Sequence, residues 1–531
     1  MGLLNSLDVA IIVGSLVLVV GIGLWAARHQ EKTARGYFLA SGRLPWYLIG
    51  AAFVSTSVSS EQIVGTVGAT YRNGLGIANW ELWCLPVYAL TMIFFIPVYL
   101  RNRVATVPEL LSRRFGPRCG DVYSWTMLVA YVVVFMAPIL YGGSLAFSEL
   151  TGWPFLVVLW LIVILVSLYA VKGGLRSVMF TDAVQCLLLV GGGVLLFCIA
   201  VGKTPGGWTA IVQANPERFH LYHPMDDPMA PFLGMIVGSV GVFLFYQSTN
   251  QVMIQRVLGA RSTWDGIMGI IFAGFINLAR PLVTCLLGVV VYHWIHVLKV
   301  APPLSNPDTA FPFALKILAP PWGLRGIILA GFIAAVMAAI SSLANSTATI
   351  FSLDVYHKLI NRQASERQLV RVGRIASASA LVIAALIAPA VEHLGGIFRY
   401  FQTGVTFLST PFITVILMGL LWKRTNYQGA LFGLIGGSVI QVVVAVGASL
   451  AGFSLHWLYL AFIAQMLIIP CIILVSMKTS QPALEQWQPF HWTPRLLASY
   501  DEGTVRPWYQ KPVFWFSVYA VVWILPYWFY W

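Results

Sequence analysis

Apolar runs of about 20 residues alternate with short polar connections along almost the whole chain. A helix of that length crosses the roughly 30 Å hydrocarbon core of a bilayer. The pattern therefore predicts an all-α integral membrane protein with about fourteen transmembrane helices. The predicted spans are 8–27, 46–71, 77–100, 122–150, 154–172, 178–202, 232–250, 266–296, 325–357, 372–393, 396–422, 427–450, 455–477 and 512–530.

The connections are too short to hold a separate globular domain. The longest three, 203–231, 297–324 and 478–511, have roughly thirty residues each. Residues 1–531 are thus expected to form a single membrane domain.

Two stretches interrupt the apolar pattern with polar residues near the middle of a span. They are Ser55–Gly65, "STSVSSEQIVG", and Phe245–Gln251, "FYQSTNQ". A carboxylate inside a membrane, here Glu61 beside Gln62, is costly and usually functional. We expect broken helices around a binding site, because unpaired backbone is tolerated only next to protein or a water-filled cavity. The alternative is a polar stripe that only packs against other helices.

The same stretches predict an inverted five-plus-five repeat, since each begins one candidate half of five spans. The first repeat would cover 46–202 and the inverted second repeat 232–422. One extra helix (8–27) precedes them, and three extra helices (427–531) follow.

Composition and charge agree with a bilayer protein. The chain is 59% hydrophobic and 10% charged, with mean hydropathy +0.80. Of its 32 Lys and Arg residues, 24 lie in or beside odd-numbered connections, which predicts that these face the cytoplasm and that both termini lie outside. Short basic loops explain the net charge of +13, so no nucleic-acid partner is expected. We expect a multi-pass protein of the plasma or inner membrane.

Enzyme signatures are missing from the sequence. It contains no P-loop, G-x-S-x-G or H-E-x-x-H motif, and its H-x-x-H pairs provide too few ligands for a zinc site. Neither an enzyme nor a resident cofactor is expected.

Seven sequence blocks resemble the sodium/solute symporter family, and within it the bacterial sodium/galactose and animal sodium/glucose transporters. They are "GYFLASGRLPW" (36–46), "SSEQIVG" (59–65), "TVPELLSRRF" (106–115), "VKGGLRSVMFTDAVQ" (171–185), "NQVMIQRVLGARS" (250–262), "NSTATIFSLDVY" (345–356) and "GLLWKR" (419–424).

The resemblance implies a solute site at mid-membrane. In sugar-carrying members, positions that match Gln62, Glu81 and Gln402 hydrogen-bond hydroxyl groups, and one that matches Tyr246 covers the solute from the inner side. Two further positions depart from these relatives, which have a polar residue where this chain has Phe135 and a lysine where it has Asn277.

Two arginines lie near this predicted pocket. Arg280 follows Asn277 by one helical turn, and Arg399 precedes Gln402 by three residues. They suit an anionic solute such as an acidic sugar. Alternatively, Arg280 pairs with a nearby carboxylate and Arg399 lies at the outer interface.

The coupling ion implied by the resemblance is sodium, which would be bound by carbonyl groups of Ser55, Val58 and Ala335 and by two serine hydroxyls. Those serines are replaced by Ala338 and Ala339. Three alternatives follow: a rearranged sodium site that uses Ser341 or Ser342 with Ser55 or Ser59, proton coupling through Glu61 or Asp182, or ion-independent facilitation. Asp182 matches an acidic residue on the cytoplasmic ion path of relatives, or it only caps a helix.

The sequence therefore predicts a secondary transporter that moves a small polar solute, such as a sugar, polyol or acidic sugar, together with a cation by alternating access. A membrane receptor that binds the solute without transporting it is the alternative from another functional class.

Overall fold

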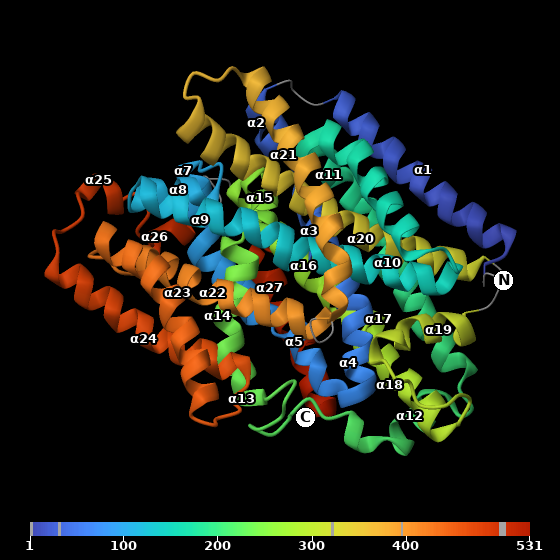
Figure 1. Cartoon of the computed structure of the whole chain (residues 1–531). Helices are drawn as coiled ribbons and strands as arrows, with labels where there is room; N and C mark the ends of the chain where they lie inside the picture. The colour runs from blue at the N-terminus through green and yellow to red at the C-terminus, as the bar shows by residue number, and fades with distance from the viewer. Residues whose placement is uncertain (1–3, 30–32, 320–322, 394–396, 499–505) are drawn as a thin grey trace.

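Helices form every regular element in the computed structural model, which describes residues 4–29, 33–319, 323–393, 397–498 and 506–531. Within these ranges there is no β-strand, and an isolated bridge joins Leu44 to Ala260. Figure 1 shows α1 and α24 on opposite sides of the bundle. The prediction of an all-α membrane protein is confirmed.

The helical elements follow one another along the chain with short connections, and η marks a short 3₁₀ or π segment. The first are α1 (Ser6–Arg28), α2 (Ala34–Leu39), η1 (Ala40–Gly42), α3 (Trp46–Ser57), η2 (Glu61–Gly65), α4 (Thr66–Asn73), η3 (Leu75–Ala78), α5 (Asn79–Leu82), α6 (Cys84–Leu90), η4 (Thr91–Phe95), α7 (Ile96–Asn102) and α8 (Val107–Arg114). Then come α9 (Pro117–Ala130), η5 (Tyr131–Met136), α10 (Ala137–Thr151), α11 (Phe155–Lys203), α12 (Gly207–Ala214), η6 (Pro216–Arg218), α13 (Phe232–Gly234), η7 (Met235–Ser239), α14 (Val240–Leu244), η8 (Phe245–Thr249) and α15 (Gln251–Leu258).

The remaining elements complete the second part of the chain. They are α16 (Thr263–Leu278), α17 (Arg280–Val283), α18 (Cys285–Tyr292), η9 (His293–Val297), η10 (Pro307–Thr309), α19 (Ala310–Leu318), α20 (Leu324–Thr349), η11 (Ile350–Ile360), α21 (Glu366–Ile387), η12 (Ala388–His393), α22 (Ile397–Leu421), α23 (Tyr427–Leu450), α24 (Trp457–Lys478), α25 (Leu484–Trp487), α26 (Arg495–Ala498), η13 (Trp508–Gln510) and α27 (Pro512–Tyr530).

Eleven helical segments among the described residues are long and apolar enough to cross a membrane, or up to twelve if the bent pair Phe232–Gly238 and Gly241–Thr249 counts as one span. The predicted count of fourteen is not confirmed. Two predicted spans are not among these segments: 46–71 is broken near its middle, and Phe155–Val171 is shorter than a full span.

Both polar stretches singled out in the sequence interrupt their helices. Helix α3 ends at Ser57, and Val58 is extended with φ −112° and ψ 110°. Likewise η8 ends at Thr249, and Asn250 is extended with φ −81° and ψ 122°. The Asn250 side chain caps α15 by accepting from the Val252 N–H, and it also accepts from the Tyr131 hydroxyl at 2.7 Å. The expected helix breaks are thus confirmed.

Two further interruptions shape the centre of the molecule. Helix α11 contains a kink at Gly174, whose φ of 56° and ψ of −159° favour glycine. The other interruption separates α16, α17 and α18, where Pro281 lacks a backbone donor and Thr284 leaves ideal helical geometry at φ −114° and ψ −78°. Helix α11 packs against α20 and α1, and α3 packs against α16. The segments at the two polar stretches, η2 and η8, both pack against α22 (Ile397–Leu421).

Candidate solute and ion sites

A small internal cavity of about 40 Å³ lies between the broken segments. It is lined by Ser57, Gln62, Trp80, Cys84, Val242, Phe243, Tyr246, Gln247, Arg280, Phe401, Gln402 and Val405. Three residues predicted to bind solute, Gln62, Tyr246 and Gln402, thus share one cavity although they lie on η2, η8 and α22. A volume of 40 Å³ admits only a few water molecules, so a solute must displace side chains to enter.

Arg280 stands between this cavity and Glu81. Its Nη2 donates to Gln62 Oε1 at 3.0 Å and lies 3.6 Å from Glu81 Oε1. The Thr284 hydroxyl is 2.9 Å from both Glu81 oxygens. Both members of this ion pair are buried, with exposed fractions of 5% for Arg280 and 1% for Glu81. The sequence left open whether Arg280 contacts an anionic solute or pairs with a nearby carboxylate, and in the structure it pairs with a carboxylate.

Glu81, Asn277 and Phe135 therefore do not line the cavity. The buried Asn277 side chain donates to the Tyr88 hydroxyl and accepts from Arg280 Nη1 at 3.3 Å. The Phe135 ring stacks on Tyr246 with ring centroids 6.2 Å apart. These three residues form a second layer that supports Arg280 and Tyr246.

Gln247 is a cavity residue that the sequence reasoning did not single out. It is buried, and its Oε1 atom has no hydrogen-bond partner among the described residues. An unpaired buried acceptor is costly unless a ligand or water completes it. Its position inside "FYQSTNQ" was the available signal, because that stretch was already predicted to face a binding site.

A second, larger cavity has a volume of about 1280 Å³, and we call it the vestibule. Gly65, Ala69 and Arg72 line the vestibule and follow Gln62 at helical spacing, so one face of η2 and α4 leads from the vestibule to the solute cavity. The vestibule and the solute cavity thus lie along the same helical face.

Three carboxyl groups, Asp226, Asp227 and Asp308, line the vestibule. Burial raises the pKa of Asp308 to about 6, outweighing a hydrogen bond from the backbone of Ile397. For Asp227, partial burial is outweighed by His223 and by backbone N–H groups, which bring its pKa down to about 2. The pKa values of these two vestibule carboxyl groups are therefore shifted in opposite directions.

The region expected to bind sodium has some suitable oxygens. The Ser55 hydroxyl is buried and has no partner among the described residues, and the end of α3 at Ser57 frees carbonyl groups of its last turn. Hard oxygen ligands of this kind suit a small cation. Ala335, Ala338 and Ala339 are also buried on α20, but the last two supply no hydroxyl.

Ser342 and Asp182 belong to a separate buried cluster. Arg256 Nη2 lies 3.3 Å from Asp182 Oδ2 and also donates to the Ser342 hydroxyl. Thr56 Oγ1 lies 3.3 Å from Asp182 Oδ2 and 3.1 Å from Ser342 Oγ. The capping role considered for Asp182 is wrong, because the span that contains it begins at Gly173, nine residues earlier, and the residue is buried against Arg256. Ser341 donates instead to the Ala338 carbonyl at 3.0 Å.

The side chains of Glu61 and Arg399 lie outside the described part of the structure, so their predicted roles remain open.

A scan of known protein families supplies the decisive observation. The sodium:solute symporter family matches residues 37–437. The chain belongs to the sodium:solute symporter family. It is therefore a sodium-coupled solute symporter of a membrane, not an enzyme.

Curated relatives of this symporter cover most of its length. A sodium/glucose cotransporter of Vibrio parahaemolyticus is 32% identical over 464 residues, which cover 81% of this chain and 84% of the relative. A sodium/myo-inositol cotransporter of Mus musculus is 31% identical over 541 residues, which cover 91% of this chain and 75% of the relative.

Solved structures support the same fold. A substrate-bound, outward-open Na⁺-coupled sialic acid symporter matches with a TM-score of 0.80 at 22% identity, covering 90% of this chain and 99% of that one. The nucleobase-cation symporter Mhp1 matches with a TM-score of 0.53 at 13% identity, covering 86% of this chain and 98% of that one. At these identities, the likeness concerns the fold alone.

Proposed function

We propose that this symporter moves a neutral polyhydroxylated solute, a sugar or a polyol, together with sodium by alternating access. The observation that carries this proposal is the Arg280–Glu81 pair beside a cavity lined by Gln62, Gln247 and Gln402. The relatives named for glucose and myo-inositol support the same solute class.

The charges around the cavity favour a neutral solute. Arg280 is its one charged lining residue among those described, and Glu81 compensates that charge from the second layer. A carboxylate on the solute would compete with Glu81 for Arg280 and leave a net negative charge in a buried site, which is expensive. Hydroxyl groups face no such penalty.

The amide side chains suit hydroxyl recognition because each offers both donor and acceptor atoms. The Gln62 carbonyl accepts from Arg280, so its NH₂ group is left to donate to the solute. Gln247 Oε1 is an unused acceptor. In this proposal Tyr246, backed by Phe135, covers the solute from the side opposite the vestibule.

Sodium binds in this proposal near the break after α3. The ligands would be the Ser55 hydroxyl and carbonyl groups of Ser55, Val58 and Ala335. With Ala338 and Ala339 in place of serines, the site has fewer oxygens, and weak sodium binding follows.

The proposed location is the plasma or inner membrane, with both termini outside. In that orientation the vestibule opens to the outside, because its lining includes residues of the 203–231 and 297–324 connections. The five-plus-five repeat, 46–202 and 232–422, is part of the same proposal and is supported by the breaks at Val58 and Asn250.

Transport by purified protein in liposomes tests the function. A panel of hexoses, inositols and acidic sugars is offered with an inward sodium gradient or with choline in its place. Sodium-dependent accumulation of a neutral sugar or polyol is the expected result. Accumulation of acidic sugars alone would reject the neutral class, and uptake unchanged in choline would favour proton coupling or facilitation.

An acidic sugar is the second candidate, and one specific observation favours it. Arg280 Nε is buried without a hydrogen-bond partner among the described residues. A solute carboxylate that displaced Glu81 would use this donor. Solute binding without counterflow would instead identify a receptor.

A further inference from the structure

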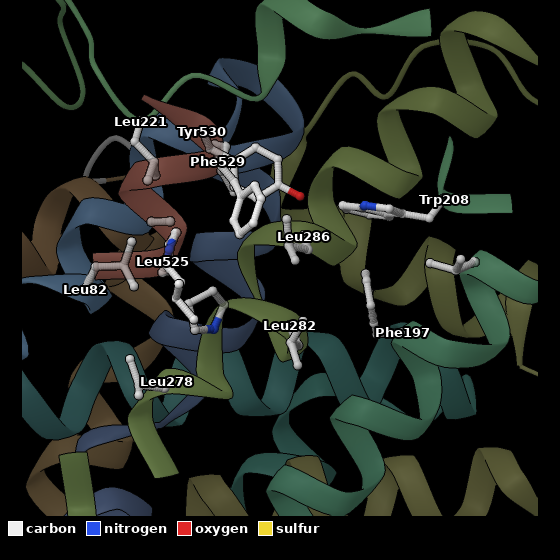
Figure 2. A pocket seen from close by; sticks show the side chains of 15 residues that line it. Leu82, Phe197, Trp208, Leu221, Leu278, Leu282, Leu286, Leu525, Phe529 and Tyr530 are labelled. Atoms are coloured by element: carbon white, nitrogen blue, oxygen red, sulfur yellow. The ribbon is translucent and has the colours of Figure 1, made fainter. Parts of the chain in front are cut away.

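A second cavity, of about 440 Å³, lies on the other side of the Arg280 turn. Fifteen residues line it, and none of them is charged (Figure 2). Figure 2 shows Leu282 and Leu286 near its centre, Phe197 and Trp208 on one side, and Leu525 and Phe529 on the other. We call this space the apolar slot.

The walls of the slot belong to membrane-spanning segments. They come mainly from Leu75–Asn102, Gly173–Lys203, Thr263–Val297 and Pro512–Tyr530. The rim on α27 is exposed, with exposed fractions of 47% for Leu525 and 71% for Phe529. Because α27 borders the bilayer, its rim meets lipid tails. Water would find few partners on such walls.

The slot also has the depth expected for one lipid tail. It extends from Leu221 and Tyr530, beside the 203–231 connection, to Leu278, next to the mid-span Arg280. Because Tyr530 ends α27 and Leu278 lies near the middle of the span Thr263–Val297, the slot runs from one end of the spans to about the middle of the roughly 30 Å hydrocarbon core, the reach of one acyl chain. We propose that an acyl chain of a membrane lipid occupies the apolar slot and supports the turn that carries Arg280.

The support argument rests on α17, a turn of four residues between two helix breaks. Successive helical residues are about 100° apart, so Leu282 points away from Arg280. Accordingly, Arg280 lines the solute cavity while Leu282 and Pro281 line the slot. A filled slot adds packing contacts to one face of this turn, and an empty slot leaves those contacts unmade.

Hydrogen bonds tie the slot to the other member of the ion pair. On α27, the Tyr527 hydroxyl donates to Asn79 Oδ1 at 2.9 Å, and Trp523 Nε1 donates to the Leu82 carbonyl. Asn79 Nδ2 in turn donates to the Leu221 carbonyl at 2.7 Å. These bonds anchor α5, which carries Glu81, and leave the adjacent slot wall apolar.

Photo-crosslinking tests the occupant without reference to the transported solute. The full chain is reconstituted with phosphatidylcholine that carries a diazirine on its acyl chain, and labelled residues are mapped by mass spectrometry. Labelling of the buried Ala78 and Leu82, which are 1% and 4% exposed, is expected together with rim labelling. Labels confined to the rim and to outward residues such as Val521 would overturn the proposal.

A filling variant supplies the matched comparison. Leu282→Trp should reduce labelling of Ala78 and Leu82 at least fivefold, while Leu187→Trp, at a lipid-exposed position of α11, should label like the parent chain. Undiminished labelling of these residues in Leu282→Trp would count against the slot. If that variant does not fold, Leu286→Phe makes the same comparison with less added volume.

Support of the Arg280 turn is tested by solute binding to the same proteins. Leu282→Trp or Leu286→Phe should change solute affinity by about threefold or more, with Leu187→Trp unchanged. Equal solute affinities in all these proteins would overturn the proposal that the acyl chain supports the Arg280 turn. Whether an acyl chain occupies the slot would still be decided by the crosslinking result.

Discussion

Arg280 Nη2 donates to Gln62 Oε1 at 3.0 Å and thereby joins α17 to the π segment η2. The two residues are 218 positions apart in the chain. Since both line the solute cavity, a change at either position alters the donors and acceptors that face the solute.

Loss of the arginine should be more damaging than loss of the whole ion pair. Arg280→Met leaves Glu81 buried without its cation, and breaking a buried pair costs about 3–5 kcal/mol. We expect a lower thermal unfolding midpoint in detergent for Arg280→Met. The double variant Glu81→Gln with Arg280→Met should recover much of that loss. Additive destabilisation in the double variant would contradict a direct pair.

Gln247 should contribute to solute affinity although it was not predicted from the sequence. Gln247→Leu removes the unpaired Oε1 acceptor, and one hydrogen bond of about 1–1.5 kcal/mol corresponds to about a tenfold change in affinity. Uptake kinetics should show a raised KM. Gln441→Leu is a suitable control, because that buried glutamine lies on α23 and does not line the cavity.

The two proposed hydroxyl-binding amides should behave in the same way. Gln62→Ala and Gln402→Ala are each expected to lower uptake at low solute concentration about tenfold. Scintillation proximity binding separates affinity from turnover. Uptake left untouched by both changes would show that solute binds elsewhere.

Sodium dependence should strengthen when the missing hydroxyls are restored. In the parent chain, replacing sodium with choline at fixed pH should reduce uptake. Ala338→Ser together with Ala339→Ser should lower the sodium concentration for half-maximal uptake, because two hard oxygens are added on α20, which packs against α3. Ala344→Ser, also on α20, serves as a control. An unchanged sodium requirement would place the ion away from these positions.

The vestibule should make sodium-dependent uptake sensitive to mild acid. Asp308, with a pKa of about 6, is mostly protonated at pH 5 and ionised at pH 7, whereas Asp227 stays ionised over this range. The extra charge at pH 7 should attract sodium, so half-maximal uptake should need more sodium at pH 5. Asp226, Arg72 and His456 also face this space.

Asp308→Asn should flatten this pH dependence. Asp226→Asn should shift the sodium concentration for half-maximal uptake but keep its dependence on pH. The same group affects stability with a defined sign. Its folded pKa exceeds the ordinary value of 3.8, so stability should fall as the pH rises from about 4 through about 6. Thermal unfolding of the parent and of Asp308→Asn at pH 5 and 7 measures this difference.

The sequence alone was sufficient for the features that depend on local composition. Apolar runs predicted the membrane helices, because each run must satisfy its own backbone in lipid. The hydroxyls and amides around Val58 and Asn250 predicted the two helix breaks, because unpaired backbone groups in a membrane need polar surroundings. The quoted blocks pointed to the family that the comparison with known proteins then confirmed.

Tertiary structure decided which predicted residues share the cavity. Gln62, Tyr246 and Gln402 line it, whereas Arg280 separates Glu81 from it and Phe135 lies behind Tyr246. The order of these layers depends on how broken helices from distant parts of the chain pack together. Neither residue type nor helical spacing encodes that packing. Glu81, which the sequence predicted to be a solute ligand, is therefore the partner of Arg280 in the fold.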